Sequence, residues 1–300
     1  MNIYHSLEEY RQKNQDRRHT SVTPGKFDGL HLGHMKLIRR VLEQASSLDL
    51  QSVVLTIETS GSGILSHEER AQILEESGID TLIECPFTTS FREMSPAQFA
   101  SLVLDQTLHT AYAAVGSDFR FGQNRAGDAQ MLALYADAFG ARTQIFPKET
   151  YLSEEISSTR VREALRSADL ELVSALLGRD YCVKGTVCHG RRLGASIGIP
   201  TANLLPPPDK ILPPDGVYAS RVLLPDHSVK SAVTNIGLRP TVHGTHRTIE
   251  THIPGYEGDL YTKQLTVSIL RRLRPEIRFD SLEDLKAQMR KDIEECRSDT

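Results

Sequence analysis

The chain has 300 residues, of which 39% are hydrophobic and 25% charged, and its formal net charge is -4. This length leaves room for two domains, and the composition is that of an ordinary globular protein. The charge gives no global basic field, which disfavours a nucleic-acid partner, although a local basic patch stays open. No apolar run approaches the ~20 residues that span a bilayer, and residues 1–18 lack the apolar core of a signal peptide. We therefore expect no membrane partner and a cytoplasmic location, and we leave self-association open.

The four cysteines are expected to be reduced thiols. They are Cys85, Cys182, Cys188 and Cys296, and no two of them form a C-x-x-C pair. Reduced cysteines are typical of a cytoplasmic protein. The spacing of Cys182 and Cys188 leaves a zinc site as the alternative, although no matching second pair follows.

The first predicted elements surround a glycine-rich turn, residues 25–34, which reads G-K-F-D-G-L-H-L-G-H. A short strand over residues 19–23 precedes it, and apolar residues at helical spacing predict a helix over residues 35–44. Glycines in such a turn let a ligand come close to the backbone, and a helix N-terminus presents free N–H groups that suit phosphate.

His31 and His34 lie three residues apart in this turn, so both can point at one phosphate. The alternative interpretation is a structural turn with two surface histidines. A metal site is a weaker alternative, because no third ligand stands nearby in the sequence.

The rest of the first half alternates strands and helices. We predict strands over residues 52–57, 81–84, 111–115 and 143–146. Predicted helices begin after Ser66, which opens a capping box, at Ser95-Pro96, and at Asp128. This alternation predicts a parallel sheet with helices on both faces, and ligands of such sheets bind beyond the carboxyl ends of the strands.

Two further stretches in this half carry candidate binding residues. The turn after residue 115 reads V-G-S-D-F-R-F-G, which is either a ligand-binding turn or a surface loop with two anchoring phenylalanines. Residues 156–162 read I-S-S-T-R-V-R and open a helix. Their hydroxyls and arginines suit phosphate oxygens, with an ordinary helix cap and solvated arginines as the alternative.

The pattern changes near residue 181, where we predict the boundary between domains 1–180 and 181–300. A short helix over residues 169–177 precedes the boundary. After it we predict strands over residues 183–187, 217–224, 229–234, 248–253 and 260–270, and a final helix from Ser281 to about residue 295. Short antiparallel strands with one terminal helix predict a small closed barrel.

Two motifs stand out in the second half. Residues 185–190 and 194–203 are glycine-rich and end in Pro-Thr-Ala-Asn; Thr201 and Asn203 offer hard oxygen ligands suited to Mg²⁺. The alternative is a glycine-rich barrel corner. Residues 235–241 read N-I-G-L-R-P-T, and Glu250 follows in a predicted strand, where it is either an outward solvated residue or an inward catalytic one.

Together these motifs resemble the bacterial bifunctional riboflavin kinase/FAD synthetase (FMN adenylyltransferase) family, over about residues 20–297. The first three stretches are similar to the nucleotidyltransferase half, which carries an H-x-G-H signature. The G-x-P-T-A-N segment, N-I-G-x-R-P-T and the later glutamate resemble the kinase half, whose fold is a six-stranded barrel. The resemblance implies phosphorylation of riboflavin to FMN by Mg²⁺-ATP, then adenylylation of FMN to FAD with release of pyrophosphate.

The resemblance also implies roles for individual residues. His31, His34 and Arg162 would stabilise phosphate charge, and Glu250 would take the proton from the ribityl 5′-hydroxyl. Ser158 and Thr159 would hold the triphosphate with Arg162, and Thr201 and Asn203 would bind Mg²⁺-ATP. The full set expected to bind ATP or flavin is Gly25, Phe27, Asp28, Gly33, Asp118, Phe119, Ser158, Thr159, Gly185, Gly190, Gly194, Thr201 and Asn203.

The sequence departs from the family at several places: Lys26 stands where asparagine is common, Pro24 stands where an apolar strand residue is common, and a whole segment differs. After its second strand the family usually carries an F-x-P-H-P-like segment, whereas residues 56–63 here read T-I-E-T-S-G-S-G. A riboflavin kinase whose adenylyltransferase half is impaired is therefore one rival hypothesis. A second is a flavin- or nucleotide-binding regulator without turnover, and a third is nucleotidyl transfer to a non-flavin phosphate.

Overall fold

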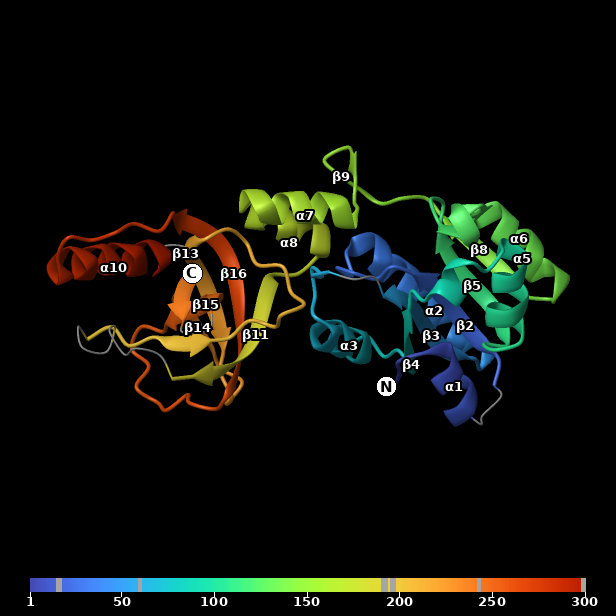
Figure 1. Cartoon of the computed structure of the whole chain (residues 1–300), viewed down its shortest axis with the longest axis horizontal. Helices are drawn as coiled ribbons and strands as arrows, with labels where there is room; N and C mark the ends of the chain where they lie inside the picture. Colours follow the sequence, from blue (N-terminus) through green and yellow to red (C-terminus); the bar gives the residue numbers. More distant parts are fainter. Residues whose placement is uncertain (15–17, 59–60, 190–193, 195–197, 242–243, 298–300) are drawn as a thin grey trace. The chain divides into compact units, whose positions relative to one another are not determined.

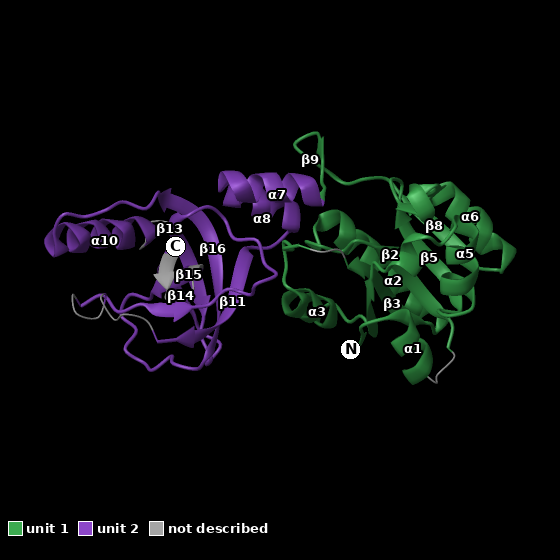
Figure 2. Cartoon of the chain, viewed as in Figure 1, with its two compact units in different colours: residues 1–157 green, residues 158–300 purple. Residues whose placement is uncertain are grey.

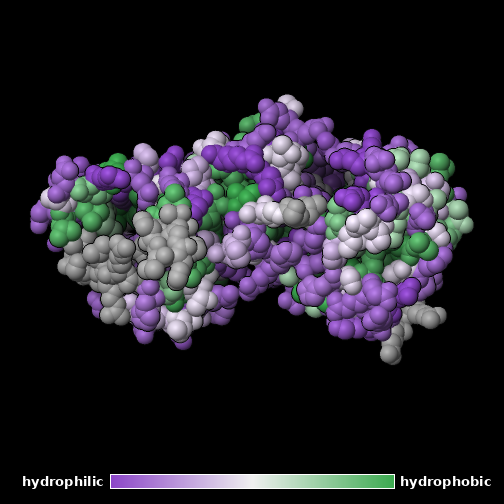
Figure 3. Space-filling view, viewed as in Figure 1, coloured by the Kyte–Doolittle hydropathy of each residue, from purple (hydrophilic) through white to green (hydrophobic). Residues whose placement is uncertain are grey.

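The computed structural model describes residues 1–14, 18–58, 61–189, 194, 198–241 and 244–297. The chain divides into two compact units, residues 1–157 and 158–300 (Figures 1 and 2). Helices α7 (Ser158–Ser167) and α8 (Leu170–Leu177) belong to the second unit. Nowhere in the described ranges is a helix both long and apolar enough to cross a membrane. The face of the molecule seen in Figure 3 is mainly hydrophilic, with hydrophobic side chains in limited patches.

The first unit is built on a six-stranded sheet in the order β1-β4-β3-β2-β5-β8, in which every pair of neighbours is parallel. This confirms the predicted parallel sheet, and it adds β1 at one edge, which the sequence did not reveal. The strands are β1 (Asn2–Tyr4), β2 (Thr20–Gly25), β3 (Gln51–Glu58), β4 (Thr81–Pro86), β5 (Thr110–Gly116) and β8 (Arg142–Phe146).

Both faces of the sheet are covered, because successive side chains of a strand point to opposite faces. Val53 and Leu55 pack with residues of α1, η1 and α6, whereas Val54 packs with residues of α2 and α3. These elements are α1 (Leu7–Lys13), α2 (Leu32–Leu48), α3 (His67–Glu76), η1 (Phe99–Asp105) and α6 (Ala129–Ala138).

Short elements complete the first unit. They are α4 (Thr89–Arg92), α5 (Pro96–Gln98), β6 (Arg120–Phe121), η2 (Gln123–Arg125), β7 (Gly127–Asp128), β9 (Thr150–Tyr151) and β10 (Glu154–Glu155).

The helix starts follow the predicted caps. Ser66 and Ser95 each form a complete capping box, in which the serine hydroxyl accepts the N–H of the third helical residue. After Ser95 the chain makes only three α-helical residues before it continues as the π-helix η1. A cap predicts where a helix begins, but it does not predict this change in helix type.

The second unit contains a closed barrel of six antiparallel strands in the order β11-β12-β15-β14-β13-β16. Five of these strands were predicted from the pattern, and the barrel implied by the family resemblance is confirmed. The sixth strand, β12, is only three residues long. The strands are β11 (Tyr181–Cys188), β12 (Ala202–Leu204), β13 (Gly216–Leu223), β14 (Val229–Thr241), β15 (Gly244–His252) and β16 (Gln264–Arg274).

The terminal helix α10 (Leu282–Arg297) packs on the outside of the barrel. Its Cys296 lies in one apolar cluster with Val217, Ala219 and Val233 of strands β13 and β14. These three residues therefore mark the outer face of the barrel.

A row of hydroxyl groups marks the inner face of the barrel. Ser220, Thr234 and Thr251 are fully buried, and their oxygens are joined at 2.7 Å and 3.0 Å across strands β13, β14 and β15. Because side chains alternate along a strand, Glu250 points away from Thr251 and lies on the outer face. The predicted inward position of a catalytic Glu250 is therefore wrong, and the outward position is the observed one. The side chain is half-buried, however, rather than fully solvated as the outward alternative implied.

Candidate active sites

The glycine-rich turn connects β2 to α2 at the carboxyl end of the sheet. His31 is the N-cap of α2, and its Nδ1 accepts the backbone N–H of His34 at 3.3 Å. The two imidazole rings stack with centroids 3.7 Å apart. A side chain at Gly33 would come within 3.2 Å of the His31 ring, so this glycine leaves room for the cap. The structure thus brings together the two histidines that the sequence singles out.

The cap also determines the tautomer of neutral His31. Because Nδ1 accepts a hydrogen bond, the ring proton is on Nε2, which can donate to an anion. Leu30 directly before it has a left-handed backbone with φ of 45°, an uncommon conformation for leucine that turns the chain into the cap. His31 is only 7% exposed, so a hydrogen bond to phosphate would form in a partly dehydrated setting.

Phe27 and Asp28 stand in the first half of this turn. Phe27 is buried with its ring 4.9 Å from that of His34, and its backbone N–H donates to Thr56 Oγ1 at 3.4 Å. Asp28 is buried and accepts the N–H of Ile64 at 2.8 Å. A side chain at Gly25 would come within 3.2 Å of Phe27. Through these contacts the three residues support the histidine turn, and their binding of ATP or flavin stays a prediction.

The second predicted turn lies after β5 at the same end of the sheet. Asp118 is 3.2 Å from Lys148, which follows β8 and is also 2.6 Å from Glu155. The hydrogen bond that Lys148 donates to Glu155 raises the pKa of Lys148. Burial opposes this rise, and the bond to Asp118 adds to it. Phe119 stacks on Phe121 with ring centroids 5.5 Å apart. Asp118 of this turn and Glu155 thus hold Lys148 between two carboxylates.

A network of charged residues occupies the carboxyl ends of β3 and β4. Arg70 of α3 lies 2.5 Å from Glu84 and 2.7 Å from Glu58, and it is only 5% exposed. His67 lies 3.0 Å from Glu84, and His5 lies 3.2 Å from the other oxygen of the same carboxylate. Burial tends to raise the pKa of Glu84, but the hydrogen bonds from Arg70 and His67 together hold it below its ordinary value.

Glu58, His67 and Glu84 are spaced closely enough to hold a metal ion. The guanidinium of Arg70 contacts both carboxylates, however, so it already supplies the positive charge that a cation would bring. We interpret the group as an ion-pair network that holds the start of α3 against the sheet. This network was not predicted from the sequence, because its residues stand in four separate segments.

The third predicted motif lies in the second unit. Helix α7 begins at Ser158, so Ser158 and Thr159 are in its first turn and Arg162 follows on the same helix. The helix predicted to open in this motif is present. The two histidines belong to the first unit and these three residues to the second.

In the barrel, Glu250 stands between two asparagines on neighbouring strands. It is the register partner of Asn203 on β12 and of Asn235 on β14. Directly opposite residues of antiparallel strands share a face, with Cβ atoms about 4.5–5.5 Å apart. The three side chains therefore form one row, which we call the outer row (Asn203, Glu250 and Asn235).

Asn203 is 7% exposed, and its Nδ2 donates to the carbonyl of Thr201 at 3.3 Å. Its Oδ1 is buried and accepts no hydrogen bond from any residue that the structure describes. A buried acceptor without a donor is costly, so this oxygen is suited to a ligand that completes it. His252 holds the chain that leads to Thr201 and Asn203, because its Nδ1 lies 2.7 Å from the carbonyl oxygen of Pro200.

A pocket of about 380 Å³ opens beside Thr201. It is lined by Val187, Pro200, Thr201, Ala202, Thr251, Ile253, Tyr256, Glu257, Gly258, Asp259, Leu260 and Tyr261. Its size and its aromatic side chains suit a nucleotide-sized ligand, and Glu257 and Asp259 add two carboxylates to its lining.

Three glycines of the second unit were predicted to bind ATP or flavin. A side chain at Gly185 would come within 2.9 Å of the Leu205 carbonyl, and one at Gly194 would clash with the Ile199 carbonyl. Both positions therefore need the close backbone approach that glycine allows. Gly190 lies outside the described residues.

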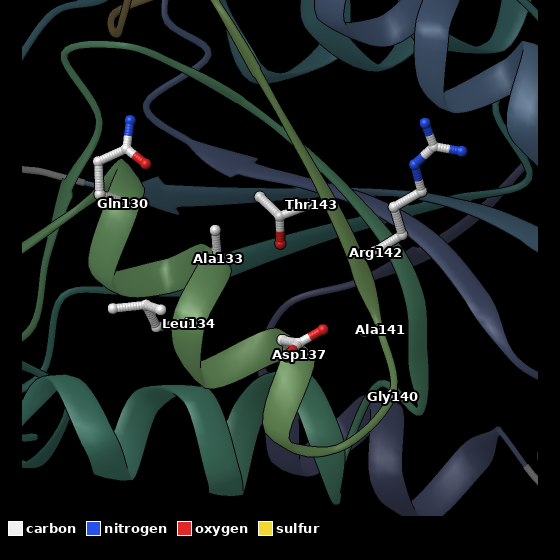
Figure 4. A pocket seen from close by; sticks show the side chains of 8 residues that line it. All are labelled: Gln130, Ala133, Leu134, Asp137, Gly140, Ala141, Arg142 and Thr143. Atoms are coloured by element: carbon white, nitrogen blue, oxygen red, sulfur yellow. The ribbon is translucent and has the colours of Figure 1, made fainter.

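A larger pocket, of about 560 Å³, lies between α6 and β8 (Figure 4). Its lining includes Leu134, Asp137 and Arg142. Because it lies where β8 begins, it is at the opposite end of the sheet from the histidine turn, and none of the predicted site residues lines it.

Two families of known proteins match different parts of the chain. The FAD synthetase family model matches residues 13–160, and the riboflavin kinase family model matches residues 177–299. The chain is 33% identical to the bifunctional riboflavin kinase/FMN adenylyltransferase of Haemophilus influenzae, over 93% of each chain. It is 35% identical to the protein of the same name from Escherichia coli K12, over 90% of each chain.

A solved structure from Streptococcus pneumoniae, described as a macrolide-efflux protein, matches with a TM-score of 0.86 and 28% identity. The match covers 99% of this chain and 98% of that one. It therefore extends over both units of the chain.

Proposed function

The chain belongs to the family of bifunctional riboflavin kinase/FMN adenylyltransferases, and from that premise we propose how its residues perform the two activities. The enzyme phosphorylates riboflavin to FMN and transfers AMP from ATP to FMN, which gives FAD and pyrophosphate. We assign adenylyl transfer to residues 1–180 and phosphorylation to residues 181–300.

The single observation that carries the kinase assignment is the outer row, with Glu250 between Asn203 and Asn235. Glu250 takes the proton of the ribityl 5′-hydroxyl as that oxygen bonds to the γ-phosphorus of ATP and the bond to ADP breaks. Phosphoryl transfer needs chiefly positioning and charge neutralisation, so one base beside a metal–nucleotide site suffices.

The residues at one end of the outer row fit Mg²⁺. Asn203 Oδ1 is a buried oxygen acceptor that is not satisfied within the described residues, and Thr201 adds a hydroxyl two residues away. Hard oxygen donors of this kind are the ligands Mg²⁺ prefers. When bound there with ATP, the ion neutralises phosphate charge. The pocket beside Thr201 is the proposed location of the nucleotide.

In the first unit we assign phosphate contacts to His31 and His34. The FMN phosphate is already ionised, so attack on the α-phosphorus of ATP needs no strong base. The Nε2–H of His31 and the N-terminus of α2 stabilise the charge that develops as pyrophosphate leaves. Phe27 and Asp28 support the turn, and Asp118 and Phe119 are proposed to belong to the flavin crevice.

The remaining roles are proposals from the family resemblance. Ser158, Thr159 and Arg162 are assigned to the triphosphate, as hydroxyls and an arginine at the start of a helix suit phosphate. We also infer a cytoplasmic enzyme without a nucleic-acid partner, and the net charge of -4 supports the second part of this inference.

The test is a time course with purified protein, riboflavin, ATP and Mg²⁺, in which flavins are separated by chromatography. FMN should form first and FAD should follow. FMN without FAD would contradict the adenylyltransferase assignment and point to the missing F-x-P-H-P-like segment as the cause. No FMN would contradict the kinase assignment.

A further inference from the structure

The outer row is extended by a second carboxylate. Asn235 Nδ2 donates to Glu276 Oε1 at 3.0 Å. Glu276 follows β16 in sequence, beyond Arg274 and Pro275, and folds over β14.

Gly237 makes the room for this carboxylate. It is two residues beyond Asn235 on β14 and so shares its face. A Cβ atom at this position would lie 2.8 Å from Glu276 Cδ and closer still to its Oε1. The carboxylate therefore fills the space where any other residue would carry its side chain.

The two amides that flank Glu250 are each fixed through their nitrogen. Asn203 Nδ2 donates to the Thr201 carbonyl and Asn235 Nδ2 donates to Glu276. In each amide the oxygen is directed away from the group that holds the nitrogen. Glu276 thus determines which way the acceptor oxygen of Asn235 faces.

The two ends of the row differ in the group that holds the asparagine. The carbonyl of Thr201 holds Asn203 and the carboxylate of Glu276 holds Asn235, while Glu250 stands opposite both. At the Asn235 end, the carboxylates of Glu250 and Glu276 and the amide oxygen are all acceptors, which suits a neutral polyol, whose hydroxyls all donate.

We propose that Glu276 is a positioning residue of the kinase site, which orients Asn235 so that its amide oxygen accepts a hydrogen bond from a hydroxyl of the ribityl chain. The inference rests on the proposed kinase function. It gives the row an order that matches the reaction: nucleotide at Asn203, base at Glu250 and polyol at Asn235.

The experiment compares three variants of the full chain: Asn235→Asp, Glu276→Gln and the double variant. Asn235→Asp places two carboxylates 3.0 Å apart, so the KM for riboflavin should rise about 10- to 100-fold while the KM for ATP changes little. Glu276→Gln retains an acceptor for Asn235, so the change should stay within about 3-fold. In the double variant the amide introduced at position 276 donates to the carboxylate introduced at position 235, and the riboflavin KM should return close to that of Glu276→Gln.

Riboflavin affinity is measured in parallel from the quenching of flavin fluorescence, which needs no turnover. If wild-type protein binds riboflavin without forming FMN, the proposed kinase activity is refuted. The riboflavin affinities of the variants would still test whether Glu276 orients Asn235. A double variant as weak as Asn235→Asp would overturn the inference. So would an equal rise in both KM values, because it would indicate a general effect on the barrel. Conversion of added FMN to FAD is the internal control and should be unchanged in all three variants.

Discussion

The two proposed sites of this enzyme are assembled in opposite ways. In the first unit, ten consecutive residues supply the turn, its glycines and both histidines, and the helix cap joins His31 to His34 locally. In the barrel, the outer row draws Asn203, Glu250 and Asn235 from three strands, and Glu276 reaches it from beyond a fourth.

The difference shows where each geometry is determined. Local backbone conformation and a helix cap determine the histidine site, so it depends on a few glycines and on the supports beneath them. Strand register determines the barrel site, so it depends on the whole sheet. Variants that damage one site and spare the other test this separation directly.

The largest effect is expected for Glu250→Gln. Loss of the proposed general base should slow FMN formation by about 10²- to 10⁴-fold, whereas FMN-to-FAD conversion should not change. Steady-state assays of each half-reaction measure this. Glu283→Gln, at an exposed position of α10, is the control and should affect neither. Loss of both activities in a folded Glu250→Gln protein would contradict separate sites.

Arg70→Met should destabilise the first unit by about 3–5 kcal/mol, because it leaves two carboxylates without their buried cation. Chemical denaturation followed by adenylyltransferase activity measures the effect, and kinase activity should persist at denaturant concentrations where FAD formation is lost. Arg11→Met removes an exposed pair with Glu8, 3.7 Å apart, and should cost less than about 1 kcal/mol. Equal effects of the two changes would show that the network does not support the fold.

His31→Ala should slow FMN-to-FAD conversion by about 10²- to 10³-fold, the usual cost of one lost donor to a developing charge. Riboflavin phosphorylation should stay at the wild-type rate. Since His31 is also the cap of α2, His31→Asn is the matched variant: it should restore thermal stability but not the rate. Recovery of the rate in His31→Asn, whose amide also offers an N–H donor, would mean that the reaction does not require the imidazole.

The smallest expected effect is on how the free energy of unfolding depends on pH. The folded-state pKa of Glu84 is lowered, so its contribution to stability is present above its ordinary pKa of 4.5 and is lost as the pH falls through the lower folded value. Below about pH 4.5, Glu84→Gln should therefore show a flatter dependence of unfolding free energy on pH than wild type. Parallel curves for the two proteins would contradict this.

The sequence predicted much of this architecture because its signals were local. Alternation of strands and helices, the capping boxes at Ser66 and Ser95, and Gly178 after α8 needed only neighbouring residues. The turn with His31 and His34 was equally visible, and the structure joins the two as expected.

The parts that the sequence did not reveal depend on distant segments. Strand β12 is too short for any periodicity, yet it carries Asn203 into the row. Asn235 was visible within a motif, but its role depends on register with Glu250 and on contact with Glu276, which is 41 residues away in the sequence. Arg70 was seen only as part of a helix, because its two carboxylates stand on separate strands.

Strand register also limits how this enzyme can change in length during evolution. One residue inserted into β15 between Gly244 and Glu250 would turn either the base or its neighbours to the opposite face of the barrel. Two inserted residues would restore the face but would move Glu250 past its partners. Length variation in related barrels should therefore collect in the connections between strands, while the strand segments that carry the row keep a constant number of residues.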